Sequence, residues 1–89
     1  MLRLSEDFIC RKICGETLVM PVGEKTKEYN GIFTLTETGA FLLDAIAEGA
    51  DEETAAARLA ESFEISVADA RQDTAEFLAQ LRGYGILLE

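Results

Sequence analysis

The chain has 89 residues, 48% of them hydrophobic, and carries eight Lys and Arg against seventeen Asp and Glu, a formal charge of -9. This length predicts a single domain over residues 1–89, and the hydrophobic content argues against a disordered chain. The negative charge would repel nucleic-acid phosphates, so we expect no nucleic-acid partner.

The sequence offers little from which a membrane segment or a catalytic centre could be built. No apolar run approaches the roughly 20 residues that cross a bilayer, and the N-terminus lacks the apolar region of a signal peptide. Cys10 and Cys14 are expected to be reduced thiols within one strand, and there is no His and no Cys-x-x-Cys pair. We therefore expect a cytoplasmic protein that is not an enzyme and that holds no metal or cofactor.

The first third of the chain predicts three β-strands. Residues 8–14 and 17–22 are β-prone runs joined at Gly15-Glu16, a pair typical of a type II′ hairpin turn. A third strand is expected over residues 31–35, after the polar segment 23–30. Strands so close in sequence favour an antiparallel meander, which leaves two open edges.

The rest of the chain predicts three helices, over residues 37–48, 52–63 and 67–82. Each is preceded by a side chain that can accept a hydrogen bond from a helical N–H group: Thr36, Asp51 and Ser66. We expect Gly49 to end the first helix, and Gly83 with Gly85 to end the third. The apolar residues Ile86, Leu87 and Leu88 then form a tail that is expected to close the core.

This order of elements predicts an α+β fold, a three-stranded antiparallel sheet followed by three helices, which resembles a winged helix. A winged-helix DNA-binding transcriptional regulator is therefore one interpretation, with the helix over 67–82 as its recognition helix. That helix sums to one negative charge, because its two arginines are outnumbered by Asp69, Asp73 and Glu76. It would meet phosphates with the wrong sign.

A second interpretation places a peptide between the helix over 67–82 and an open edge of the sheet. On a helical wheel one flank of the apolar stripe carries small side chains with an arginine towards each end: Ala68, Arg71, Ala75, Ala79 and Arg82. A peptide could add to the sheet as a further strand and pack onto that flank. Alanines are also simply good helix formers, and periodicity alone favours that explanation.

Four segments, in order, carry a resemblance to a known family: FICRKICGETLVMPVG, GIFTLTETGAFLLDAI, ADEETAAARLAESFEIS and ADARQDTAEFLAQLRGYGILL. They resemble the PqqD family, the coenzyme PQQ synthesis protein D group of peptide chaperones within the class of RiPP precursor recognition elements. The most specific part is the segment over residues 31–46. Two positions depart from the family pattern: Thr36 stands where Asn is frequent, and Leu43 where Trp is frequent.

The resemblance implies a winged-helix-like protein that binds the leader of a ribosomally synthesised precursor peptide and presents it to a modifying enzyme, often a radical SAM protein. In that family the leader adds as a strand beside the third strand and packs against the third helix. The matching peptide-binding positions are Ile32, Phe33, Thr34 and Leu35 on the strand, with Arg71, Ala75, Leu78, Ala79 and Arg82 on the helix.

The sequence thus predicts a non-catalytic leader-peptide chaperone with a radical SAM partner. A DNA-binding regulator is the alternative, and a structural subunit that only stabilises its partner is a third. The open sheet edges also allow a homodimer through strand pairing.

Overall fold

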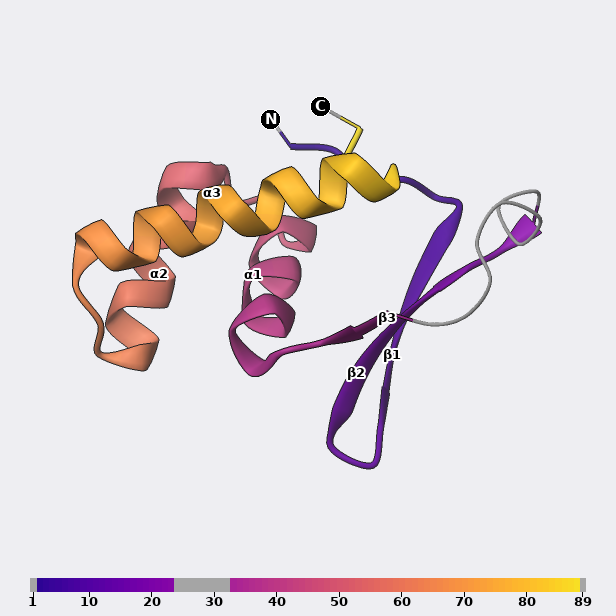
Figure 1. Ribbon diagram of the computed structural model, residues 1–89, viewed down its shortest axis with the longest axis horizontal. Helices are drawn as coiled ribbons and strands as arrows, with labels where there is room; N and C mark the ends of the chain where they lie inside the picture. The colour runs from indigo at the N-terminus through magenta and orange to yellow at the C-terminus, as the bar shows by residue number, and fades with distance from the viewer. Residues whose placement is uncertain (1, 24–32, 89) are drawn as a thin grey trace.

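The computed structural model describes residues 2–23 and 33–88. Three strands are followed by three helices (Figure 1): β1 Phe8–Ile13, β2 Glu16–Pro21, β3 Phe33–Leu35, α1 Glu37–Ala47, α2 Glu52–Phe63 and α3 Val67–Tyr84. The strands form one antiparallel sheet in the order β1-β2-β3. The predicted fold class, a three-stranded antiparallel sheet followed by three helices, is confirmed.

The hairpin between β1 and β2 turns one residue earlier than the sequence indicated. Ile13 pairs with Glu16, so Cys14 and Gly15 are the two turn residues. Both have positive φ, 52° and 81°, which defines a type I′ turn and not the predicted type II′. Because a Cys in the left-handed region is uncommon, the turn propensity of Gly15-Glu16 pointed to the wrong pair. Cys14 therefore lies in the turn and outside β1.

Other boundaries differ by one or two residues. Residues 31 and 32 of the predicted third strand lie outside the described residues. α1 ends at Ala47, one residue early, and α3 continues through Gly83 to Tyr84. Gly85, with a φ of 78°, ends α3 in the left-handed conformation that glycine favours.

All three predicted N-caps are confirmed. The side chains of Thr36, Asp51 and Ser66 accept hydrogen bonds of 3.1, 2.8 and 3.0 Å from backbone N–H groups three residues ahead. The N–H of Thr54 that donates to Asp51 also lowers the pKa of that carboxyl, because it stabilises the charged form. Each helix therefore begins where its local sequence dictates.

The hydrophobic core consists of two clusters joined by α3. One lies between the sheet, α1 and the C-terminal half of α3, with Phe8 and Val19 as its buried strand residues. The other lies between α1, α2 and the N-terminal half of α3, around Leu42 and Leu59. Phe77 packs against both clusters.

The two ends of the described chain are paired with each other, side by side in Figure 1. Leu4 forms an antiparallel bridge with Leu87, and the N–H of Ser5 donates to the carbonyl of Ile86 at 2.7 Å. Ile86 and Leu87 are buried, while Leu88 is 53% exposed. The expectation that the tail closes the core is confirmed for the first two of its residues.

Thr74 on α3 offers a test of this packing. Its side chain is fully buried, and its Oγ1 has no hydrogen-bond partner among the described residues. Thr74→Val keeps the shape and removes the unpaired hydroxyl, so it should raise the free energy of unfolding by about 1 kcal/mol. Urea denaturation followed by circular dichroism measures the change. Thr74→Ser, which keeps the hydroxyl and deletes the methyl, should destabilise; stabilisation by Ser and not by Val would contradict this account.

Candidate functional site

The position of the hairpin turn decides which backbone groups of β2 face β3. In a two-residue hairpin the residues that flank the turn, here Ile13 and Glu16, exchange hydrogen bonds with each other. Backbone groups alternate in direction along a strand, so Thr17 and Val19 of β2 direct their N–H and C=O groups away from β1 and towards β3.

The same alternation sets the free edge of β3. Leu35 and Phe33 are the partners of Thr17 and Val19, so their backbone groups are used within the sheet. Thr34 lies between them and directs its N–H and C=O to the other side, where β3 has no neighbouring strand among the described residues. Thr34 is also exposed. One donor and one acceptor are therefore placed for a further strand.

α3 runs beside this edge. The rings of Phe33 on β3 and Tyr84 on α3 have centroids 4.4 Å apart and are tilted by 41°. In Figure 1 the C-terminal half of α3 passes above β3. We use the name β3–α3 groove for the region between the edge of β3 at Thr34 and the side of α3 that carries Phe77, Gln80 and Tyr84.

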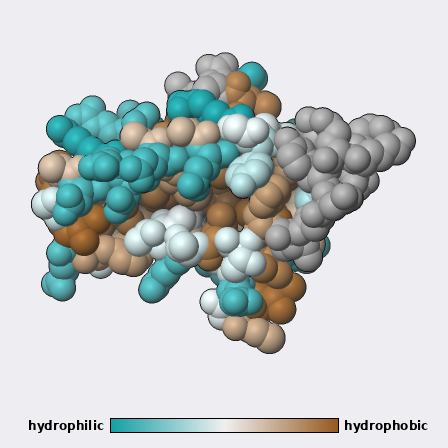
Figure 2. Space-filling model, viewed as in Figure 1, coloured by the Kyte–Doolittle hydropathy of each residue, from teal (hydrophilic) through white to brown (hydrophobic). Residues whose placement is uncertain are grey.

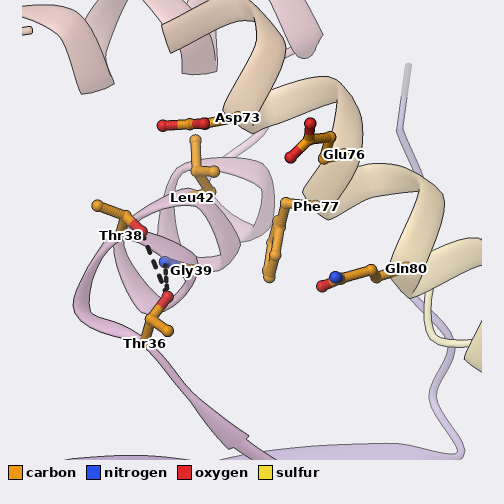
Figure 3. A pocket seen from close by; sticks show the side chains of 8 residues that line it. All are labelled: Thr36, Thr38, Gly39, Leu42, Asp73, Glu76, Phe77 and Gln80. Carbon is orange, nitrogen blue, oxygen red and sulfur yellow. Dashed lines mark hydrogen bonds between the residues drawn. The ribbon is translucent and has the colours of Figure 1, made fainter. Parts of the chain in front are cut away.

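A pocket of about 290 Å³ continues this groove past the end of β3 (Figure 3). The first turns of α1 and the middle of α3 line it: Thr36, Thr38, Gly39, Leu42, Asp73, Glu76, Phe77 and Gln80. Figure 3 shows the Phe77 ring projecting from α3 towards the first turn of α1, with Gln80 beside it. Thr36 immediately follows β3, so a strand paired with Thr34 would lead into the pocket.

The width of the pocket depends on Gly39. A Cβ atom at Gly39 would lie 3.1 Å from Cε1 of Phe77 and 3.2 Å from Oγ1 of Thr36. The Thr36 hydroxyl must stay in place because it caps α1, and Phe77 is held by both core clusters. The absence of a side chain at residue 39 therefore lets α1 and α3 approach closely at this point.

The strand residues predicted as peptide-binding lie at the groove. Phe33 and Leu35 are half-buried and point to the core side of the sheet, whereas Thr34 is exposed on its outer face. Ile32 is outside the described residues. Of the predicted strand positions, Thr34 is the one whose backbone groups face the open edge.

The helix residues predicted as peptide-binding lie elsewhere. Leu78 is completely buried in the core. Arg71 lines a hollow on the α2 side, with Glu52, Glu53 and Ala56. At 100° per residue, Ala75, Ala79 and Arg82 are exposed on the same flank as Arg71. The structure does not bring this flank to β3.

The flank of α3 beside β3 carries Asp73, Phe77, Gln80 and Tyr84 instead. These residues recur at i, i+4, i+7 and i+11, and they border the apolar stripe on its other side. The two aromatic residues, Phe77 and Tyr84, are the feature of the sequence that could have pointed to this flank. A helical wheel gives an apolar stripe two flanks, and only the position of β3 distinguishes them. Figure 2 shows hydrophilic side chains along the visible face of α3, with hydrophobic side chains below them.

The described residues provide no evident catalytic chemistry. Partial burial and the Asp44 carboxylate raise the pKa of the Cys10 thiol, the opposite of what activates a nucleophile. Within residues 2–23 and 33–88, no three His, Cys, Asp or Glu side chains are grouped so as to hold a metal ion. In the same ranges, no helix has both the length and the apolar character needed to span a bilayer.

Comparisons with known proteins give a consistent result. The family model described as Coenzyme PQQ synthesis protein D (PqqD) matches residues 16–87. A lasso peptide synthetase B1 complexed with its leader peptide has a similar structure, with a TM-score of 0.84, 19% identity, and coverage of 99% of this chain and 98% of that chain. TbiB1 in complex with the TbiA(β) leader peptide is also similar, with a TM-score of 0.81, 16% identity, and coverage of 96% of this chain and 93% of that chain. No curated protein matches the sequence.

Gly39→Val tests the close approach of α1 and α3. The new side chain would crowd Phe77 and Thr36, so we expect the free energy of unfolding to fall by about 1–3 kcal/mol. Chemical denaturation measures it. Gly83→Val is the matched control, because Gly83 is also helical and a Cβ there meets nothing within 4 Å; its effect should stay within about 0.5 kcal/mol. Equal losses in the two variants would show that crowding is not the cause.

Proposed function

This chain belongs to the PqqD family, and from that premise we propose that it is a non-catalytic peptide-binding chaperone. It recognises the leader of a ribosomally synthesised precursor peptide and presents it to a modifying enzyme. The observation that carries the proposal is the edge of β3, which has no neighbouring strand in the described part of the chain and where the backbone of Thr34 faces outward beside α3.

The leader binds as a fourth strand of the sheet. Its backbone pairs with Thr34, and alternate side chains then point to opposite faces of the extended sheet. The leader side chains on the core side pack against the aromatic residues Phe77 and Tyr84. The part of the leader that extends past Leu35 of β3 enters the pocket next to Gly39. Main-chain hydrogen bonds supply affinity, and the pocket supplies specificity.

The similar structures support this assignment. Both are described as complexes with leader peptides, and each covers more than nine-tenths of this chain. The shared fold includes an edge strand next to the last helix, the arrangement that strand addition requires. In the proposed complex Ile32, Phe33, Thr34 and Leu35 provide the strand contacts, and Phe77, Gln80 and Tyr84 provide the helix contacts.

The variant Thr34→Pro tests strand pairing. It removes the N–H at the free edge while leaving the bonds that Phe33 and Leu35 make with β2. We expect leader binding to be lost, as measured by fluorescence anisotropy with a labelled leader peptide that binds the wild-type protein.

The control for this variant is Thr34→Val, which keeps the donor and the β-propensity and should bind like the wild type. Circular dichroism establishes that both variants are folded. A folded Thr34→Pro protein with unchanged affinity would place the peptide elsewhere.

We further propose that the modifying enzyme is of the radical SAM type, which PqqD family membership favours. A radical SAM protein encoded in the same gene cluster should copurify with this chain, and more so when the precursor is present. Copurification only with an enzyme of another class would reject this partner and leave peptide binding intact.

A homodimer formed through β3 would occupy the same edge, so added leader should convert such a dimer to monomers, which light scattering detects.

A further inference from the structure

The pocket at the end of the β3–α3 groove is negatively charged. Asp73 and Glu76 are exposed, lie three residues apart on α3, and both line the pocket. Figure 3 shows Glu76 close to the Phe77 side chain and Asp73 further along α3, above Leu42 of α1. The other six residues that line the pocket are uncharged, so none of its described lining residues is a Lys or Arg that could offset the two carboxylates.

The floor of the same pocket is apolar. Leu42 is 1% exposed, and the half-buried Phe77 forms the wall opposite α1. Gly39 is buried between them and adds no side chain. A ligand in this pocket therefore meets hydrocarbon at the bottom and carboxylates at the rim.

Among the described residues that line this pocket, a positive contribution comes from the N-terminus of α1, which begins at Glu37. A helix N-terminus is equivalent to about half of a positive charge. The Thr36 side chain already accepts the N–H of Gly39, and Glu37 adds a carboxylate in the first turn. Two full negative charges at Asp73 and Glu76 therefore outweigh the helix dipole.

The arginine nearest in sequence does not neutralise the pocket. Arg71 lines a separate hollow with Glu52 and Glu53 on the α2 side of α3. The flank that the sequence indicated as peptide-binding has an arginine towards each end and would favour an acidic leader. The flank that lies beside β3 carries negative charge instead.

From this arrangement we infer that the groove selects leader segments in which a Lys or Arg accompanies the apolar residues. The inference rests on the proposed function and specifies its ligand. The aliphatic part of the basic side chain lies along Phe77, and its charged end reaches Asp73 and Glu76. An acidic residue at the same position is rejected by two carboxylates.

The test starts from a display library of random linear peptides selected on the wild-type protein. We expect the enriched sequences to contain more Lys and Arg than the starting library, next to apolar residues. One enriched peptide is then labelled, and its Kd is measured by anisotropy, together with that of a variant in which its basic residue is Glu. The Glu variant should bind more weakly, and raising the salt concentration should weaken the original peptide.

Protein variants assign the effect to the pocket. Asp73→Asn with Glu76→Gln should weaken the basic peptide by about threefold to tenfold, the range expected for two exposed charge pairs. Glu61→Gln with Glu64→Gln changes the net charge equally, but neither residue lines the pocket, so binding should be retained. Equal weakening by both double variants would trace the preference to overall charge and overturn the inference.

Thr34→Pro separates the inference from the proposed function. If it abolishes binding while the Asp73/Glu76 variant binds normally, the groove binds peptides without this charge preference and the inference fails alone. If no peptide is enriched, the proposed peptide binding itself fails. If folded Thr34→Pro binds as the wild type does, the peptide does not pair with β3, and the placement on which the inference rests is wrong. Enrichment of acidic peptides would overturn the inference directly.

Discussion

The packing of Phe77 is the interaction on which the rest of the structure depends. It is the α3 residue that contacts both hydrophobic clusters, the one under the sheet and the one between the helices. Its ring lies next to Gly39, in space that a side chain at residue 39 would need. Because α1 and α3 can approach there, α3 lies across both halves of the domain and passes beside β3. The core and the candidate site are thus parts of one arrangement.

The groove follows from what α3 leaves uncovered. The helix buries Ala70, Thr74, Leu78 and Leu81 against the other elements, and its Tyr84 ring lies against the Phe33 ring of β3. The outward backbone groups of Thr34 are therefore left at a sheet edge, which is normally a site that proteins protect. An edge that lies beside an aromatic row and a pocket has the features that strand addition by a peptide uses.

Charge separates the two surfaces of α3 that the sequence could not distinguish. The Arg71 flank faces solvent and α2, while the Asp73 flank faces the groove. This arrangement weakens the case for a DNA-binding helix, since the exposed carboxylates Asp69, Asp73 and Glu76 would lie against phosphates. It also favours a peptide ligand that carries a basic residue. Both conclusions depend on which flank lies next to β3.

The order of the elements and the starts of the helices could be predicted from local sequence patterns. Thr36, Asp51 and Ser66 act on N–H groups three residues away, so their effect is written in local sequence. The edge position of β3 also followed, because short connections favour a meander. Only the tertiary structure decided the one-residue shift of the hairpin turn, where pairing between strands holds Cys14 in a left-handed conformation. It likewise decided which flank of α3 borders the groove, because an apolar stripe has two flanks and contacts between residues more than forty positions apart select one of them.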